Sequence, residues 1–168
     1  PSTPSAPVLV IGGGPVGLTL AALLVKLGVS VTVIEVDAGY CTGSRAICMS
    51  RRSQEILSWI GADQALVEKG LSWVGGRSYY RDQEVLHFQM PSDPTERYAP
   101  MVNIQQYYVE EYAHKALVDK ASSSVDPVLW QTRLVKLTQS ESSAVAVVVD
   151  SAGREQTIHA DWVVACDG

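Results

Sequence analysis

The first residues in the chain whose types and spacing could do chemistry are closely spaced glycines. They belong to a GxGxxG motif that comprises Gly12, Gly13, Gly14, Pro15, Val16 and Gly17. In such a motif the first glycine permits a tight turn, the second lets the backbone approach a pyrophosphate, and the third lets a helix pack close to strands. The start of the following helix offers N–H groups and a positive dipole end to phosphates. The motif therefore predicts that all six residues contribute to a dinucleotide-binding site.

A carboxylate further along the chain fits the same ligand. Glu35 follows the β-branched run of residues 31–34 and would stand at the end of a second strand. There it can accept hydrogen bonds from the hydroxyls of an adenosine ribose, and its charge would repel a 2′-phosphate, which argues against NADP at this position. Because FAD and NAD both use this fingerprint, the residues themselves leave the choice between them open.

The elements that must position these residues can be read from the neighbouring pattern. Residues 8–11 are typical of a buried parallel strand, residues 15–27 have helical composition ended by Gly28, and residues 31–35 alternate as a strand. Together they form one βαβ unit. Residues 8–34 are apolar enough to resemble a membrane span, but the glycine cluster, Pro15 and Gly28 divide them. We therefore expect no membrane-spanning segment.

The rest of the chain predicts more strands and two further helices. We expect a loop over 40–50, a helix over 51–60 capped by Ser50, and strands over 73–80 and 84–90 joined at Asp82 and Gln83. A proline-rich loop over 91–100 precedes a helix over 105–121, for which Asn103 is a candidate cap. A short strand over 128–130 leads to an antiparallel meander over 134–138, 144–150 and 156–159. The segment 161–168 closes the chain with a separate strand.

Composition limits the function further. The 168 residues carry a net charge of −5, whereas nucleic-acid binding favours a basic face, so we expect no nucleic-acid partner. Three cysteines without a CxxC pair, and three histidines without ligand spacing, predict neither a disulfide framework nor a metal site. The cysteine pattern favours the cytoplasm.

Three later segments give the chain its resemblance to a known family. Gly43-Ser44-Arg45-Ala46 and the following helix resemble the "SRA … R(S/T)xE" segment of class A flavoprotein aromatic hydroxylases, the group that includes p-hydroxybenzoate, phenol and 3-(3-hydroxyphenyl)propionate hydroxylases. The family's arginine lies near the diphosphate and ribityl chain of the flavin. The resemblance therefore assigns Arg45 to cofactor binding, for which a guanidinium suits phosphate oxygens.

The other two segments match the same family. Gln106-Tyr107-Tyr108-Val109-Glu110 resembles its "QxxxE" motif, whose glutamine contacts the cofactor. Gln106 is the candidate, with Gln105 as the alternative register. Ala165-Cys166-Asp167-Gly168 resembles its "(G/A)(C/A)DG" motif, which is linked to both FAD and NAD(P)H, with Asp167 as the charged member. In the family a serine and an arginine continue this motif.

The resemblance implies an α/β fold: a Rossmann-like FAD-binding domain with a βαβ start in a parallel sheet and an antiparallel β-meander crossover. We expect a flexible tail over 1–7, FAD-binding elements over 8–72, the start of a substrate-domain sheet over 73–100, and a return to the FAD-binding domain with the meander over 101–168. Family members are several hundred residues long. We therefore expect an incomplete, N-terminal portion whose partners are the remainder of the parent chain and a small aromatic substrate.

The resemblance also implies the activity of the complete enzyme. NAD(P)H reduces FAD, and the reduced flavin uses O2 to hydroxylate a phenolic ring, so no residue of this chain needs to be a catalytic acid or base. Alternatives remain open: an inactive or FAD-binding-only fragment, another FAD oxidoreductase such as a reductase or epoxidase, and an NAD-dependent dehydrogenase domain. The Arg45, Gln106 and Asp167 segments argue against the dehydrogenase.

Several side chains are expected to play no part in the site. Arg51 and Arg52 are interpreted as solvated, and Glu110 with His114 as a solvated pair on a helix surface. The side chains of 73–90 that could line a substrate-facing sheet are instead interpreted as plain core; they are Tyr79, Tyr80, Phe88 and Met90.

Overall fold

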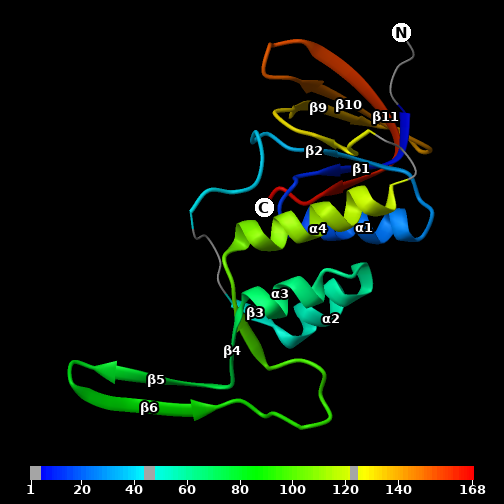
Figure 1. The fold of residues 1–168 in the computed structure, drawn as a ribbon. Coiled ribbons are helices and arrows are strands. Elements are labelled where there is room, and N and C mark those ends of the chain that lie inside the picture. Colours follow the sequence, from blue (N-terminus) through cyan, green and yellow to red (C-terminus); the bar gives the residue numbers. More distant parts are fainter. Residues whose placement is uncertain (1–4, 44–47, 122–124) are drawn as a thin grey trace.

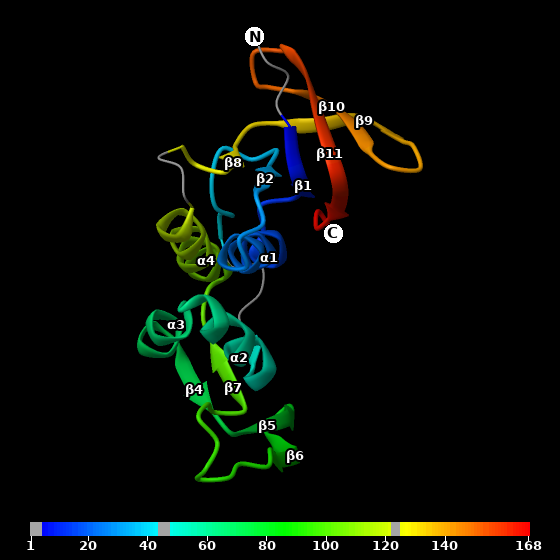
Figure 2. The same cartoon turned by 90° about the vertical axis from the view of Figure 1, so that its right-hand side faces the viewer.

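The computed structural model describes residues 5–43, 48–121 and 125–168, and its largest unit is a six-stranded mixed sheet. Within this sheet the strands run in the order β8-β2-β1-β11-β10-β9 (Figure 1; β8 is labelled in Figure 2). The four parallel strands are β8 (Val128–Leu129), β2 (Val31–Ile34), β1 (Ser5–Ile11) and β11 (Glu155–Ala165). The antiparallel pair is β10 (Ala144–Val149) and β9 (Arg133–Gln139). The predicted α/β class, βαβ start and meander are therefore confirmed.

Two features of this sheet differ from the sequence predictions by more than one residue at a strand end. Strand β1 begins at Ser5, so residues 5–7 lie in the sheet and not in a tail. The two separate strands predicted over 156–159 and within 161–168 are one strand, β11. It pairs antiparallel with β10 through its first half and parallel with β1 up to the pair of Ile11 with Ala165. A single strand thus joins the antiparallel meander to the parallel strands of the sheet.

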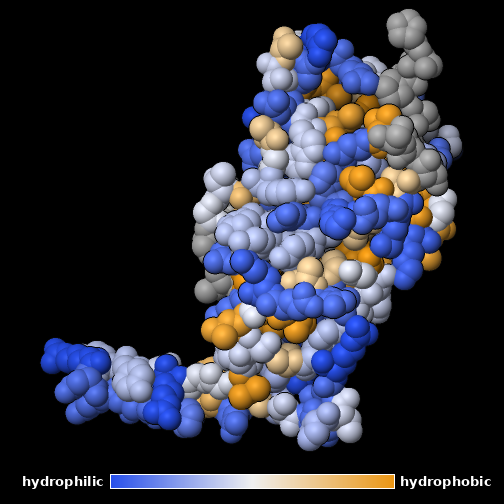
Figure 3. All heavy atoms as spheres, in the orientation of Figure 1, coloured by the Kyte–Doolittle hydropathy of each residue, from blue (hydrophilic) through white to orange (hydrophobic). Residues whose placement is uncertain are grey.

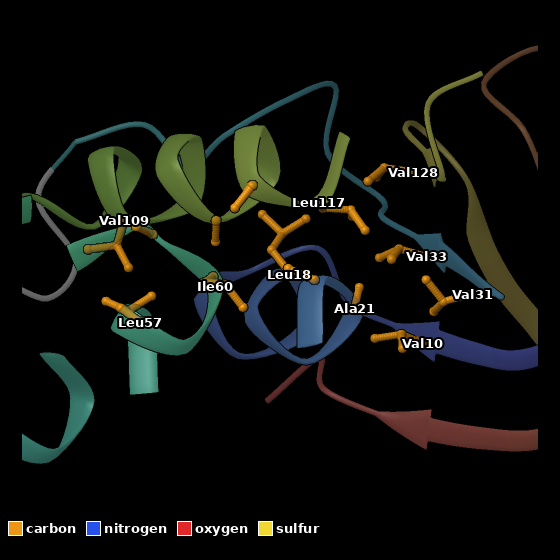
Figure 4. Close-up of a cluster of buried hydrophobic side chains, with 14 of the residues drawn as sticks. Val10, Leu18, Ala21, Val31, Val33, Leu57, Ile60, Val109, Leu117 and Val128 are labelled. Atoms are coloured by element: carbon orange, nitrogen blue, oxygen red, sulfur yellow. The ribbon is translucent and has the colours of Figure 1, made fainter. Parts of the chain in front are cut away.

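Helices α1 (Pro15–Lys26) and α4 (Gln106–Lys120) pack side by side on one face of the sheet (Figure 2). They and the strands share one buried core that includes Val10, Leu18, Val33 and Leu117 (Figure 4). The alternate residues of β1, Leu9 and Ile11, belong to a second core cluster with strands of the meander. Apolar side chains on both faces explain why β1 reads as a continuous hydrophobic run.

Below this core lies a smaller unit that the sequence analysis largely missed. It has a three-stranded sheet of β3 (Cys48–Ser50), β7 (Met101–Asn103) and β4 (Leu71–Trp73), with helices α2 (Arg51–Ile60) and α3 (Asp63–Lys69). The predicted limits of α2 are confirmed, and the Ser50 hydroxyl caps it by accepting from the Ser53 N–H. Asn103 is not a helix cap: it ends β7, and its Oδ1 accepts from Trp73 Nε1 at 2.8 Å.

The end of α2 is tied to the two large helices. Lys26 of α1 donates to the Trp59 carbonyl at 2.5 Å, and Lys120 of α4 donates to the Ile60 carbonyl at 2.7 Å. Cations at this end of a helix complement the negative end of its dipole and bind carbonyls without intrahelical donors. These two lysines therefore add polar contacts to the apolar packing of α2 against α1 and α4, in which Leu57 and Ile60 belong to the same buried core.

A two-stranded hairpin of β5 (Gly75–Tyr80) and β6 (Gln83–Gln89) projects from this unit (Figure 1). Its turn falls at Arg81 and Asp82, with Arg81 at φ 56°, one residue earlier than predicted. In the face shown in Figure 3 the hairpin extends as a mostly hydrophilic arm. Tyr79 is 56% and Tyr80 65% exposed, so interpreting them as core is wrong.

The proline-rich loop after the hairpin confirms the prediction for 91–100 and folds back on α2 and α3. Arg51 forms an ion pair with Glu96 at 2.6 Å and donates to the Tyr98 carbonyl, so its side chain holds this loop and is not simply solvated. Arg97 similarly pairs with the buried Asp63. Among the described residues, no helix has the length and apolar character needed to cross a bilayer.

Candidate cofactor-binding site

A cleft of about 480 Å³ opens at the carboxyl ends of β1, β2 and β11. This is the edge at which open α/β sheets bind ligands. Most of the predicted site residues line it, namely Gly12, Gly13, Gly14, Pro15, Glu35, Gln106 and Asp167. Val16 and Gly17 lie just behind in α1, whereas Arg45 lies outside the described residues.

The glycine turn is shaped by contacts that exclude larger residues. Gly12 has φ 104°, and a Cβ there would lie 2.6 Å from the Cys166 carbonyl oxygen. A Cβ on Gly17 would overlap the Gly12 carbonyl oxygen, so this glycine sets how closely α1 approaches the turn. A Cβ on Gly14 would meet nothing within 4 Å. The space beside the Gly14 backbone is therefore open, which leaves room for the close approach of a phosphate that the motif predicts.

The start of α1 offers donors to this space. Gly14 is the N-cap residue and supplies no side-chain cap, and Pro15 occupies the first turn. The first bond of the helix runs from the Leu18 N–H to the Gly14 carbonyl at 3.0 Å. The N–H groups before Leu18 have no acceptor within the helix, so they favour an anionic group at this position.

Glu35 ties the turn to the end of β2. Its Oε2 accepts from the Gly13 N–H at 2.5 Å, and its Oε1 accepts from the Asp37 N–H at 2.9 Å. Each carboxylate oxygen has a second lone pair, so the group retains acceptor capacity for ribose hydroxyls. The carboxylate therefore shapes the turn, in addition to the role predicted for it.

The sequence analysis missed two acidic residues of the cleft, Asp37 and Glu110. Glu110 is only 2% exposed and is therefore not part of a solvated pair with His114. Its Oε1 accepts from Gln106 Nε2 at 2.8 Å, and its Oε2 accepts from the Cys41 N–H at 2.7 Å. The i,i+4 spacing from Gln106 places both residues on one helix face, a signal in the sequence that could have identified Glu110. Of the two alternative registers, Gln106 lines the cleft, while Gln105 stands at the N-cap position without a side-chain cap bond and is exposed.

His114 lies one turn further along α4 with different partners. Its Nδ1 lies 2.8 Å from the Tyr40 hydroxyl, and its Nε2 lies 3.0 Å from Asp126 Oδ1. Burial, followed by the charges of Glu111, Asp126 and Glu110, raises the pKa of Tyr40, so the phenol stays neutral at physiological pH. This network holds the segment after β2 against α4.

The last residues of the chain complete the cleft. The Cys166 N–H donates to the Ile11 carbonyl at 2.6 Å, which places Asp167 beside the glycine turn. Burial and the neighbouring Asp167 charge raise the pKa of the Cys166 thiol, so it is protonated at neutral pH. Among the described residues, no group of three or more His, Cys, Asp or Glu side chains is arranged to hold a metal ion.

Comparison with known proteins agrees with this geometry. The chain is 27% identical to tetracenomycin A2 monooxygenase-dioxygenase of Streptomyces glaucescens, covering 99% of the chain and 33% of that protein. It is 29% identical to pentachlorophenol 4-monooxygenase of Sphingobium chlorophenolicum, covering 97% of the chain and 30% of that protein. The chain thus spans about a third of the length of these relatives.

A solved structure shows the same fold. The p-nitrophenol 4-monooxygenase PnpA of Pseudomonas putida DLL-E4 superposes with a TM-score of 0.85 at 22% identity, covering 99% of the chain and 42% of PnpA. The model of the family described as "FAD binding domain" matches residues 5–168. These findings confirm the resemblance to class A flavoprotein aromatic hydroxylases, and the chain belongs to the FAD binding domain family.

Proposed function

We propose that this chain is the N-terminal FAD-binding portion of a monooxygenase that hydroxylates a phenolic substrate with NAD(P)H and O2. The observation that carries the proposal is the cleft, in which the bare face of Gly14 and the start of α1 lie beside a carboxylate at the end of β2. The names of relatives support the substrate class, since two act on pentachlorophenol and para-nitrophenol.

The residues present fit FAD. The Gly14 backbone and the first N–H groups of α1 would hold the diphosphate, and the Glu35 carboxylate, to which the Gly13 N–H donates, would hold the ribose. Gln106 and Asp167, which also line the cleft, would contact other parts of the cofactor. Arg45 is proposed as a further diphosphate ligand on the strength of the motif resemblance.

Bound FAD would supply the redox chemistry, taking a hydride from NAD(P)H and passing electrons to O2. The residues of this chain bind and orient the cofactor.

We assign residues 8–72 and 101–168 to the FAD-binding domain and residues 73–100 to the start of a substrate-domain sheet. The projection of the β5–β6 hairpin away from the six-stranded sheet supports this division (Figure 1). The cysteine pattern supports a cytoplasmic protein whose other partners are the remainder of the parent chain and the aromatic substrate.

The cofactor is tested by purifying the chain and titrating it with FAD. We expect visible flavin absorbance and release of intact FAD on heat denaturation. A colourless protein that takes up no FAD would contradict the proposal.

The activity needs a protein that contains this chain together with the segments found in its relatives. We expect phenols to accelerate NAD(P)H oxidation and to be recovered as hydroxylated products. A second candidate is a module that binds FAD without hydroxylating, because the chain spans only about a third of its relatives. NAD(P)H oxidation that no phenol accelerates would favour this candidate or another FAD oxidoreductase.

A further inference from the structure

Two side chains of α4 form a bonded pair on the wall of the cleft. Gln106 and Glu110 both line it, and Gln106 Nε2 donates to Glu110 Oε1 at 2.8 Å. Glu110 is 2% exposed, whereas Gln106 is partly exposed. The glutamine therefore faces the space a ligand would take, and the glutamate lies behind it.

The bond determines which way the Gln106 amide is turned. A glutamine amide has a donating and an accepting end, which differ in chemistry but hardly in shape. The two Glu110 oxygens accept from Gln106 and from the Cys41 N–H, so the carboxylate faces the donating end of the amide. The accepting end, Oε1, is left for a ligand.

The other bond of Glu110 fixes the carboxylate itself. The Cys41 N–H donates to Oε2 at 2.7 Å, which ties α4 to the segment that follows β2. This segment also contributes Gly39 and Asp37 to the cleft. Because the carboxylate is buried and held from a second element, it cannot turn away from Gln106 without losing a bond.

We propose that Glu110 is a positioning residue that turns the Gln106 amide so that its carbonyl oxygen accepts a hydrogen bond from a hydroxyl of the bound FAD. The inference rests on the proposed function, because it needs FAD in this cleft. It goes further in assigning the direction of the hydrogen bond and the buried residue that sets it.

The substitution Glu110→Gln tests the direction of this bond. The new amide keeps a carbonyl oxygen for the Cys41 N–H and turns its NH2 toward Gln106. Gln106 must then turn its own carbonyl inward and present NH2 to the hydroxyl of FAD. The hydroxyl can accept from this NH2 only by turning its own O–H away from the position that it takes beside the carbonyl. We expect FAD to bind more weakly, by up to about tenfold, the effect of losing one good hydrogen bond. Titration of the chain with FAD, followed by quenching of flavin fluorescence, measures this change.

A double-mutant cycle separates positioning from a general structural effect. Gln106→Met removes the amide, so adding Glu110→Gln to it should change FAD affinity by less than about twofold if Glu110 acts through Gln106. Glu111→Gln, the same substitution at the exposed neighbouring position, is the matched control and should leave the affinity unchanged. Thermal unfolding without FAD is recorded for every variant.

The outcomes distinguish this inference from the proposed function. If the unsubstituted chain takes up no FAD, the proposed function fails. If it binds FAD but Glu110→Gln binds equally well, or the two substitutions weaken binding independently, the positioning role is wrong. Should Glu110→Gln not fold, Gln106→Glu is compared with the exchange variant Gln106→Glu/Glu110→Gln, which rebuilds the pair with its roles reversed. Tighter FAD binding by the exchange variant supports the inference, and equal or weaker binding overturns it.

Discussion

At the residue scale, two glycines of the same turn differ in what a side chain would meet. The Cβ of alanine at position 17 would overlap the Gly12 carbonyl oxygen, whereas at position 14 it would enter open space. Gly14 has φ −75°, which alanine adopts without strain. Gly17 is therefore required by the packing of the protein itself, and Gly14 by whatever fills the cleft.

We therefore expect Gly17→Ala and Gly14→Ala to separate stability from binding. Gly17→Ala should lower the free energy of unfolding by about 1–3 kcal/mol through overpacking. Gly14→Ala should change it by less than about 0.5 kcal/mol and weaken FAD binding at least about tenfold. Urea denaturation and FAD titration measure the two quantities. Undiminished FAD affinity in Gly14→Ala would show that no ligand approaches this backbone.

A second residue-scale feature is the turn between β10 and β11. Asp150 Oδ1 accepts from the N–H groups of Ala152 and Arg154, each at 2.9 Å, and Oδ2 accepts from Arg154 Nε at 2.7 Å. The hydrogen bond from the Arg154 N–H, followed by its side chain, lowers the pKa of Asp150 from 3.8. A carboxyl whose pKa is lower in the folded state stabilises that state while it is ionised.

This contribution gives the protein a defined dependence on pH. It is fully present above the ordinary pKa of 3.8 and is lost as the pH falls through the lowered value of the folded state. The difference in unfolding free energy between the unsubstituted chain and Asp150→Asn should therefore be constant at neutral pH and shrink below about pH 4. Urea denaturation across this range measures it, and a difference that grows on acidification would contradict the assignment.

At the scale of single elements, α2 has both ends defined by its own sequence. The Ser50 hydroxyl accepts from the Ser53 N–H at its start, and Gly61 follows at φ 80°. Helix α2 contributes no residue to the cofactor cleft. Its cap therefore affects stability without touching the site.

Removing this cap should cost stability alone. Ser50→Ala should lower the free energy of unfolding by about 1 kcal/mol and leave FAD affinity unchanged. Ser142→Ala, at an exposed position of the β9–β10 turn, is the control and should have no measurable effect on either. A loss of FAD affinity in Ser50→Ala would mean that α2 and the cleft are coupled.

Elements with strong local signals could be predicted from the sequence, and those made by tertiary pairing could not. The βαβ start and α2 carry caps, glycines and regular hydrophobic spacing. Strands β3 and β7 are three residues long and exist because they pair with each other, so no local pattern distinguishes them from loop. Strand β11 is continuous through tertiary pairing, with its first half on β10 and its second half on β1, so the sequence alone predicts two strands.

In the candidate site, too, some residues could be predicted from local sequence signals and others depend on tertiary contacts. The glycine turn and Glu35 follow from spacing alone, since the turn, the helix and the second strand are contiguous in sequence. The spacing places Glu110 on the same helix face as Gln106 but does not reveal its burial, because its second partner, the Cys41 N–H, lies 69 positions away in the sequence and only the fold brings it to the carboxylate. Burial of a charged side chain depends on such distant partners and leaves little trace in a single sequence.

At the scale of the whole molecule, the structure joins a well-packed core to a thin projection. The core residues around α1 and α4 are almost fully buried (Figure 4). The β5–β6 hairpin has two strands, and its outer residues, including Val85 at 62%, are exposed. An isolated two-stranded hairpin is at best marginally stable in water.

We therefore expect the hairpin to open independently of the core. In native-state hydrogen exchange, backbone amides of β5 and β6 should exchange at least about tenfold faster than those of β1, because local opening costs less than global unfolding. The β10–β11 hairpin provides an internal comparison, since it lies within the six-stranded sheet and its Ile158 side chain is only 1% exposed. Equal protection of all three regions would show that the projection unfolds only with the core.

The continuity of β11 limits how the chain can change in length. One residue inserted between Asp150 and Glu155 would enlarge an exposed turn and leave both pairings of the strand intact. One residue inserted within β11 would reverse the faces of all later side chains relative to β1. Asp167 would then no longer follow the strand in its present orientation beside the glycine turn. Tolerated insertions in this part of the protein should therefore fall in the meander turns, and evolution can lengthen those turns without disturbing the cleft.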